Sequence, residues 1–389
     1  MIFERVEYLE RLRRTRERMA ARGIDVLLLS DPANINYLSG YDGWSFYVHQ
    51  ALLVAQEEEQ PVWIGRGQDA NAARVTTFLE PANIVPYPDD FVQSEVKHPM
   101  DFVANQLRAR GWDRCRIGVE MDSFYFTAAA FEALRRNLPE TPLLDARSLV
   151  SWVRIVKSEA EIACMRQAAR IIEQVMRVAI DAVAPGVRQC DAVARIYEAQ
   201  IRGTAEFGGT YPAIAPLLPT GTGTSTPHLT WDDEPFQPDT PTILELAGCR
   251  SRYHCPMART IHLGPPPQHL ADTAEVVVEG LNAAIEAARP GALAEDVEAA
   301  WRRIIERHGI VKESRIGYSV GLGYPPDWGE RTLSLRPGDR TELQPNMTIH
   351  VIPGIWQDDW GIEISECILI TETGAATFCD FPRQLFVKT

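Results

Sequence analysis

The sequence predicts two domains of mixed helix and strand, an N-terminal α/β domain over residues 1–153 and a C-terminal α+β domain over residues 154–389. Three observations predict this. The chain has 389 residues, more than one ordinary hydrophobic core accommodates. Short apolar runs alternate with helical stretches through the first part of the chain. In the remainder, a pattern of helix, Pro-Gly break and helix occurs twice.

The N-terminal domain begins with an amphipathic, charged helix over residues 4–22, followed by the buried strand IDVLLLSD over residues 24–31. Alternating strands and helices of this kind are typical of an α/β domain. The further short apolar runs cover 51–56, 61–66, 116–121 and 142–146, and a helical stretch covers 126–138.

The C-terminal domain is expected to begin with a long helix over residues 157–183. Ser158 is its expected N-cap, and Glu161 three residues later completes a capping box. The change of pattern near Arg154 sets the expected domain boundary after residue 153.

An internal echo indicates that the C-terminal domain is duplicated. AIDAVAPGVRQCDAV (179–193) resembles AIEAARPGALAEDV (284–297), so that Pro185-Gly186 corresponds to Pro290-Gly291. Each copy is followed by a loop and then by strands, TILELAG in the first and MTIHVIPG in the second. Two α-α-β-β halves packed around one sheet are expected to bind a ligand where the halves meet.

Charge and cysteine usage exclude several classes of partner. With 39 Lys and Arg against 53 Asp and Glu, the net charge is −14. Nucleic acid and anionic membrane surfaces both select basic clusters, so neither is expected as a partner. Seven scattered cysteines without CxxC spacing indicate free thiols in a reducing compartment. The N-terminal stretch lacks a signal-peptide core, and no apolar run reaches about 18 residues, so we expect a cytoplasmic protein.

The stretch ILELAGCRSRYHCPMARTIHLG (243–264) resembles the first metal-binding motif of the pita-bread family of creatinases, prolidases and metal-dependent aminopeptidases. The resemblance implies an N-terminal creatinase-like α/β domain and a duplicated, aminopeptidase-like pita-bread catalytic domain. The metallopeptidases of the family hold two metals with two Asp, one His and two Glu.

The resemblance places unusual residues at all five of those ligand positions. Arg259-Thr260 sets the register, and the ligand positions are then occupied by Glu245, Pro256, Tyr318, Ile352 and Ser365. Proline and isoleucine offer no side-chain donor, and hard divalent ions need several oxygens. We therefore expect no metal and no cofactor, as in creatinase, which hydrolyses a small amidine-like substrate with side chains alone.

Four loop sequences narrow the resemblance to the ectoine hydrolases of bacteria. They are GYDGWSFYVHQ (40–50), PHLTWDD (227–233), YPPDWGERT (324–332) and CDFPRQLFVK (379–388). The resemblance implies metal-independent opening of the cyclic amidine ring of ectoine to N-acetyl-L-2,4-diaminobutyrate. Hydroxyectoine stays open as a second substrate. The downstream N-acetyl-diaminobutyrate deacetylase is a candidate partner.

The catalytic candidates are Glu245, His228, Glu363 and Glu366. Glu245 lies among apolar neighbours and is the expected nucleophile or, alternatively, the base that activates water. His228 matches the segment of the family's catalytic histidine and is the expected proton carrier. Strand alternation puts Glu363 on the same face as Ser365 and Glu366 on the other, so at most one of the two glutamates faces the ligand beside Ser365.

Aromatic and basic side chains in the same loops are candidates for holding a zwitterionic amidinium. By analogy with creatinase-like dimers, a homodimer is expected in which the 44–49 loop completes the site of the partner. The substrate-binding candidates are Trp44, Phe46, Tyr47, His49, Trp328, Arg331 and Trp360.

Three alternatives remain open from the sequence. The chain could be another creatinase-like amidine hydrolase, a relative of the metal-dependent Xaa-Pro peptidases, or a non-catalytic binding protein on the same fold. Retention of Glu245, His228 and the aromatic loops favours an enzyme.

Overall fold

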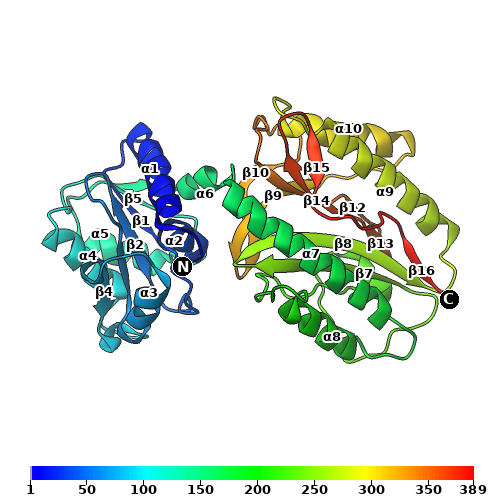
Figure 1. Cartoon of the computed structure of the whole chain (residues 1–389), viewed down its shortest axis with the longest axis horizontal. Coiled ribbons are helices and arrows are strands. Elements are labelled where there is room, and N and C mark those ends of the chain that lie inside the picture. Colours follow the sequence, from blue (N-terminus) through cyan, green and yellow to red (C-terminus); the bar gives the residue numbers. More distant parts are fainter. Residues whose placement is uncertain (1) are drawn as a thin grey trace. The chain divides into compact units, whose positions relative to one another are not determined.

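The computed structural model describes residues 2–389 and divides into two compact units, the first ending at Arg154 and the second covering Ile155–Thr389 (Figure 1). The expected boundary after residue 153 differs from this division by one residue.

The first unit is an α/β domain built on a six-stranded sheet in the order β4-β3-β2-β1-β5-β6. Strand β1 pairs antiparallel with β2 and parallel with β5, so the sheet is mixed. Its elements are α1 (Arg5–Ala21), β1 (Val26–Leu29), α2 (Pro32–Ser39), β2 (Ala51–Ala55), β3 (Val62–Arg66), η1 (Gly67–Asp69), α3 (Ala70–Thr76), η2 (Pro81–Asn83), β4 (Ile84–Tyr87), η3 (Asp89–Phe91), α4 (Pro99–Ala109), β5 (Ile117–Val119), α5 (Ala128–Asn137), β6 (Leu143–Asp145) and α6 (Leu149–Arg154).

The second unit repeats the order of two helices followed by strands, as the sequence echo predicted. In Figure 1, α7 and α8 are green and α9 and α10 are yellow. Its elements are α7 (Glu159–Ala182), α8 (Gln189–Arg202), η4 (Gly221–Ser225), β7 (Pro241–Arg250), β8 (Tyr253–Leu263), α9 (Gln268–Ala287), α10 (Ala294–Arg307), β9 (Gly317–Tyr324), β10 (Asp327–Ser334), β11 (Thr348–Val351), β12 (Gly354–Trp356), β13 (Gly361–Glu363), β14 (Glu366–Ile370), β15 (Ala375–Thr377) and β16 (Phe386–Lys388).

Helix α7 begins as the sequence predicted. The Ser158 side chain accepts from the backbone N–H of Glu161, and the Glu161 side chain accepts from the backbone N–H of Ser158. These two bonds satisfy donors that a helix start otherwise leaves unpaired.

The two Pro-Gly breaks have equivalent surroundings. Gly186 and Gly291 both have positive φ, 79° and 84°, which glycine adopts without a steric penalty. The backbone N–H of Gly186 donates to Phe236, and that of Gly291 donates to Leu343. The same local geometry in both halves confirms the duplicated plan.

The central sheet of the second unit runs β15-β14-β11-β9-β8-β16, with β7 paired to β8 and β10 paired to β9. Helix α7 packs closely on β7 at Gly248, where a Cβ atom would lie 2.0 Å from the carbonyl oxygen of Ala168. Only glycine permits this approach, and the contact places the β7–β8 hairpin against the helix.

The β7–β8 hairpin contains most of the stretch 243–264, and its two strands pair antiparallel. Glu245 lies opposite Ala258, and Ala247 lies opposite Pro256. Both strands are buried along nearly their whole length. A charged group on them therefore faces a protein interior rather than water.

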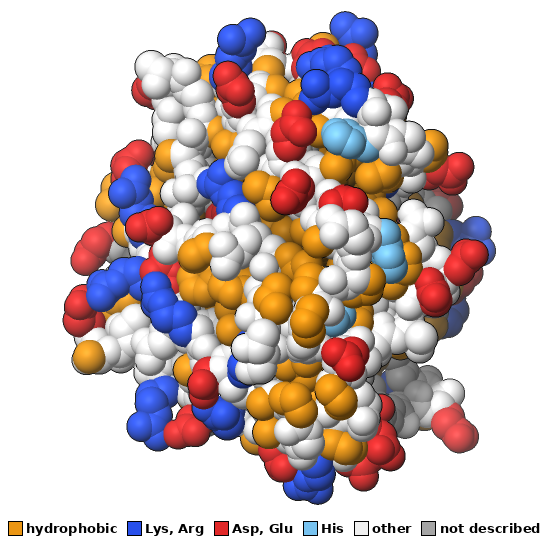
Figure 2. All heavy atoms as spheres, turned by 90° about the vertical axis from the view of Figure 1, so that its right-hand side faces the viewer, with side chains coloured by type: hydrophobic (Ala, Val, Ile, Leu, Met, Phe, Trp, Pro, Cys, Tyr) orange, Lys and Arg blue, Asp and Glu red, His pale blue; other side chains and the backbone are white. Residues whose placement is uncertain are grey.

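The outer surface carries charges of both signs. Figure 2 shows one face, with apolar side chains gathered at its centre and acidic and basic side chains interspersed at its rim. Among the helices of the described residues, none is both long enough and apolar enough to cross a bilayer.

Candidate active site

Glu245 is a buried carboxylate without a hydrogen-bonding partner. It lies on β7 with 5% of its surface exposed, and its side chain receives no hydrogen bond from residues 2–389. Burial, and then the charge of Asp327, raise the pKa of Glu245 to about 8. A carboxylate in this setting gains most from a cationic ligand that restores its charge.

Glu363 is the second buried carboxylate of the site. It ends β13, and Thr260 on β8 holds its backbone by accepting from the N–H at 2.9 Å and donating to the C=O at 3.0 Å. Its Oε2 atom is buried and has no partner among the described residues. Burial and the charge of Glu245 raise the pKa of Glu363 well above its usual range, and Lys312 partly opposes the effect.

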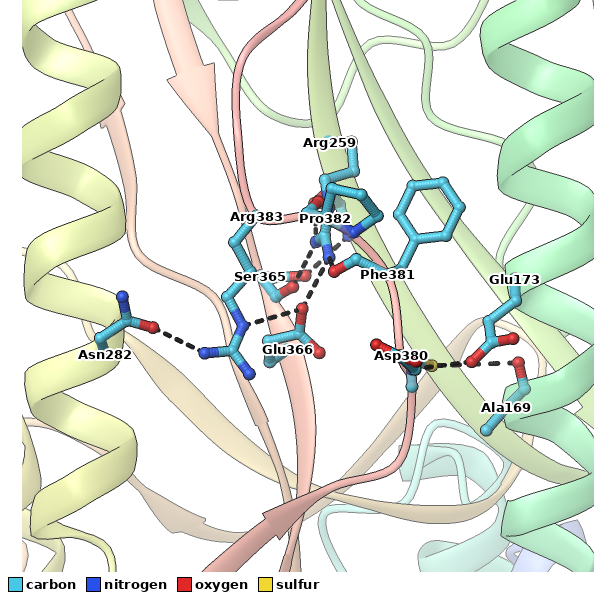
Figure 3. Close-up of polar contacts among 12 residues, drawn as sticks. Ala169, Glu173, Arg259, Asn282, Ser365, Glu366, Asp380, Phe381, Pro382 and Arg383 are labelled. Carbon is cyan, nitrogen blue, oxygen red and sulfur yellow. Dashed lines mark hydrogen bonds and ion pairs between the residues drawn. The ribbon is translucent and has the colours of Figure 1, made fainter.

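Glu366 has a different environment from Glu363. Arg259 Nη2 lies 2.6 Å from Glu366 Oε1, and Arg383 Nε lies 3.3 Å from the same atom (Figure 3). Arg259 also donates to the carbonyl oxygen of Ser365 at 2.6 Å, in the break between β13 and β14. Glu366 is therefore engaged in a buried ion pair. Arg259 is its partner and is not the partner of Glu245.

Two basic side chains lie close to groups of the site, Lys312 to Glu363 and Arg315 to Tyr318. Lys312 Nζ donates to the carbonyl oxygen of Gly354 at 2.7 Å and lies 4.1 Å from the centre of the Trp356 ring. Burial lowers the pKa of Lys312 to about 8, and the charge of Glu363 partly opposes this. The Arg315 guanidinium lies 4.5 Å from the centre of the Tyr318 ring.

A chain of hydrogen bonds surrounds Tyr318. Trp328 Nε1 donates to the Tyr318 hydroxyl at 2.9 Å, and that hydroxyl lies 3.2 Å from His350 Nδ1. His350 Nε2 lies 2.8 Å from Ser365 Oγ, which also accepts from the backbone N–H of Ala258 at 2.7 Å. Ala258 lies opposite Glu245 across the β7–β8 hairpin. The chain of bonds therefore ends at the backbone of the residue that pairs with Glu245.

His228 lies on an exposed loop after η4. The loop returns to the sheet through a bond from the Leu218 N–H to the Leu229 carbonyl oxygen at 3.0 Å. The preceding residue, Leu217, exchanges two backbone hydrogen bonds with Glu245. Backbone hydrogen bonds thus connect Leu229, the residue after His228, through Leu218 and Leu217 to Glu245.

The other predicted binding residues of the second unit occupy different environments. Trp328 is fully buried, and besides supporting Tyr318 its ring lies 6.1 Å from that of His254. Trp360 is half-buried, with its ring 5.0 Å from that of His269, and it directly precedes β13. Arg331 is exposed and has a positive φ of 56°.

The predicted binding residues of the first unit gather in one loop. Trp44 and Tyr47 are 58% and 61% exposed, and the ring centres of Trp44 and Phe46 are 4.8 Å apart. Phe46, Tyr47 and His49 line a cavity of about 360 Å³. Burial and then His98 lower the pKa of His49 to about 4.

The residues at the family's ligand positions do not fit a pair of metal ions. Pro256 and Ile352 have no donor atom, and the oxygens of Tyr318 and Ser365 are engaged with His350. Within residues 2–389, no group of three or more His, Cys, Asp or Glu side chains is arranged to hold a metal ion. Together these positions lack the several oxygen ligands that a dinuclear metal site requires.

The fold and this site define the class of protein. Residues 163–372 match the metallopeptidase family M24, and residues 11–156 match the creatinase/prolidase N-terminal domain. The chain therefore belongs to the M24 family and is a hydrolase of that family.

Individual relatives refine the class. The chain is 48% identical over 393 residues to a protein named ectoine hydrolase from Halomonas elongata, covering 99% of this chain and 98% of that protein. It is 45% identical over 386 residues to the uncharacterized hydrolase/peptidase y4tM of Sinorhizobium fredii, covering 99% and 98%. Among solved structures, a prolidase from Thermococcus sibiricus shares the fold with a TM-score of 0.85 at 19% identity, covering 98% of this chain and 99% of that chain.

Sequence reasoning missed four residues of this site, Lys312, Arg315, Asp327 and His350. His350 stood in the quoted segment MTIHVIPG, but nothing in the order of residues shows that it meets Tyr318. Lys312 and Arg315 belong to the polar segment VKESR, which reads as an ordinary surface loop.

Proposed function

We propose that this chain opens the cyclic amidine ring of ectoine by hydrolysis, giving N-acetyl-L-2,4-diaminobutyrate without a bound metal. The relative from Halomonas elongata supports the substrate. The observation that carries the proposal is the pair of buried carboxylates, Glu245 and Glu363. Burial raises the pKa of both, and the charge of Glu245 raises that of Glu363 further.

The electrostatics of the site suit this zwitterion. An amidinium placed between Glu245 and Glu363 relieves their repulsion and replaces the water that burial has removed. The ligand's carboxylate needs donors, and Lys312, whose charge acts on Glu363, and Arg315, which lies over the Tyr318 ring, are the cations proposed to supply them. Neither a neutral amide nor a peptide chain would compensate two buried carboxylates in this way.

The proposed reaction begins with Glu245. Its carboxylate oxygen attacks the ring carbon between the two nitrogens, which forms a C–O bond and leaves both nitrogens uncharged. One ring nitrogen must then gain a proton to leave as an amine. Glu363, whose pKa burial raises well above its usual range, is the proposed acid, and His228 on the exposed loop is the proposed proton carrier. Addition of water then releases the product and regenerates Glu245.

Metal independence belongs to the proposal because Pro256 and Ile352 supply no ligand atoms. Purified protein should convert ectoine to N-acetyl-diaminobutyrate at the same rate before and after treatment with a chelator. Elemental analysis should find less than one tightly held metal per chain. Loss of turnover on chelation, with recovery on adding zinc or manganese, would show a metallohydrolase. Absence of product from ectoine and hydroxyectoine alike would refute the substrate.

The proposal also includes a homodimer in which Trp44, Phe46, Tyr47 and His49 complete the site of the partner. The exposure of Trp44 and Tyr47 supports it, because large aromatic side chains left open to water are typical of binding surfaces. Mixing a Trp44→Ala chain with a Glu245→Ala chain should restore part of the activity. Hybrids that form without any recovery would contradict shared sites.

All seven cysteines are free thiols. A reducing cytoplasm maintains cysteines in this state, so the free thiols support a cytoplasmic location. The acetylated product makes an N-acetyl-diaminobutyrate deacetylase the expected next enzyme.

A further inference from the structure

The loop of residues 217–229, called here the His228 loop, is closed at its base by a backbone hydrogen bond. The N–H of Leu218 donates to the carbonyl oxygen of Leu229 at 3.0 Å. The Leu229 side chain also lies against Gly223, where its Cδ1 atom would be 3.3 Å from a Cβ atom. Because His228 directly precedes Leu229, the backbone on that side of the proposed proton carrier is fixed.

The first part of the His228 loop is fixed to β7, the strand of the proposed nucleophile. Leu217 and Glu245 exchange two backbone hydrogen bonds, at 3.1 and 3.2 Å. Three residues further on, the hydroxyl of Thr220 lies 3.2 Å from the hydroxyl of Thr242, which is fully buried on β7. The loop therefore starts out along β7.

The middle of the His228 loop, the short helix η4, is fixed to a different strand. Thr224 is fully buried in η4, and its hydroxyl donates to the carbonyl oxygen of Gly221 at 2.7 Å. The same hydroxyl accepts from the backbone N–H of Gly361 at 3.1 Å, at the start of β13. A Cβ atom at Gly361 would lie 2.0 Å from the Thr224 carbonyl oxygen, so only glycine permits this contact.

Strand β13 carries Glu363, the second carboxylate of the site, and packs against β7 and β8 (Figure 1). Gly361 and Glu363 are two residues apart on one face of the strand, which is about 7 Å. Thr260 holds the backbone of Glu363 to β8 with two hydrogen bonds. The His228 loop therefore connects the strands of both carboxylates. Among residues 2–389, Thr224 makes its one side-chain hydrogen bond to β13.

We infer that Thr224 is a positioning residue for His228, because its hydroxyl fixes the His228 loop to the strand that carries Glu363. The inference rests on the proposed function, in which Glu363 is the acid and His228 the proton carrier. Three residues separate Thr224 from His228, so a shift of η4 off β13 moves the histidine as well. Loss of the hydroxyl favours that shift, since the buried Gly361 N–H would have no acceptor where it now lies.

The step that depends on this contact is proton transfer. General acid–base groups contribute about 10²- to 10⁴-fold to a rate, and a misplacement of about 1 Å can cost 10²-fold. Substrate binding is proposed to come from the charges of Glu245 and Glu363, which the loop does not supply. A displaced His228 loop should therefore lower kcat and leave KM nearly unchanged.

The test uses Thr224→Val, which keeps the shape of the side chain and removes its hydroxyl. With ectoine, kcat should fall about 10- to 10²-fold while KM stays within about twofold of the wild type. Thr224→Ser retains the hydroxyl and should keep most of the activity. The decisive measurement is a double-mutant cycle with His228→Ala. If Thr224 acts through His228, the double variant should be as slow as His228→Ala alone.

Thr348→Val is the matched control, because Thr348 is equally buried and donates to the carbonyl oxygen of Val320 at 2.6 Å, away from the His228 loop. Its effect on kcat should be less than about twofold, and the same in the wild type and in His228→Ala. Thr242→Val provides the test if Thr224→Val does not fold. It removes the contact with Thr220 on the β7 side and should lower kcat less, with the same dependence on His228.

The outcomes separate the inference from the proposed function. A normal kcat in the folded loop variant, or a loss that multiplies with that of His228→Ala, would overturn the role of Thr224. Wild-type rates in His228→Ala would overturn both this inference and the role of His228, while the substrate stands. No ectoine turnover by the wild type would refute the proposed function itself.

Discussion

Replacing Glu245 with glutamine should stabilise the second unit at alkaline pH while abolishing turnover. The pKa of Glu245 is raised to about 8 in the folded protein, against about 4.3 in an unfolded chain. The folded state therefore holds this proton more tightly than the unfolded state. Stability that Glu245 contributes when protonated is fully present below about pH 4 and is lost as pH rises through about 8.

The size of the effect follows from that difference. At 1.36 kcal/mol per pKa unit, the rise corresponds to an upper limit of roughly 5 kcal/mol. Part of the repulsion is shared with Glu363 and Asp327, so about 2 to 4 kcal/mol at pH 9 is the reasonable expectation. For a unit of this size each kcal/mol moves Tm by about 2–4 °C, which predicts an increase of roughly 5 to 15 °C.

The assay is thermal unfolding followed by circular dichroism at pH 5, 7 and 9. Glu245→Gln should exceed the wild type only slightly at pH 5, where the loss has just begun, and increasingly at pH 7 and pH 9. Glu366→Gln is the control, since it makes the same change at a similarly buried glutamate that is paired with Arg259. It should lower stability by about 3–5 kcal/mol at neutral pH, because it leaves a buried guanidinium without its counter-ion. Destabilisation by Glu245→Gln at pH 9 would refute the reasoning.

Two further predictions concern the framework. Gly248→Ala should lower Tm and the soluble yield, because its Cβ would lie 2.0 Å from the Ala168 carbonyl oxygen and must push α7 off β7; an unchanged Tm would contradict this close packing. His49, whose pKa is lowered to about 4 mainly by burial, should stay neutral from pH 8 down to about pH 5 in an NMR titration, whereas a midpoint near pH 6.5 would show that its ring is hydrated.

Local patterns in the sequence were sufficient for the elements. The Ser158–Glu161 capping box, the two Pro-Gly breaks and the apolar runs at β1 and β7 depend on residues within a few positions of one another, so their outcome can be predicted without the fold. The absence of a metal-ligating side-chain atom at Pro256 and Ile352 was equally predictable, because the side chains of proline and isoleucine lack such an atom in any fold. Strand alternation predicted opposite faces for Glu363 and Glu366 on one strand, whereas the structure places them on two strands, β13 and β14, with a break between them.

Which of these two glutamates joins Glu245 was decided only by the tertiary structure. Arg259 lies 107 residues from Glu366 in the chain, and the β8 strand carries its guanidinium to that carboxylate. Glu363 is left beside Glu245 with an unpaired oxygen. The meeting of His350 with Tyr318 and Ser365 likewise depends on the register of β9 against β11 and on the break before β14. Contacts between strands far apart in sequence are selected by packing of the whole sheet, and for that reason no local pattern encodes them.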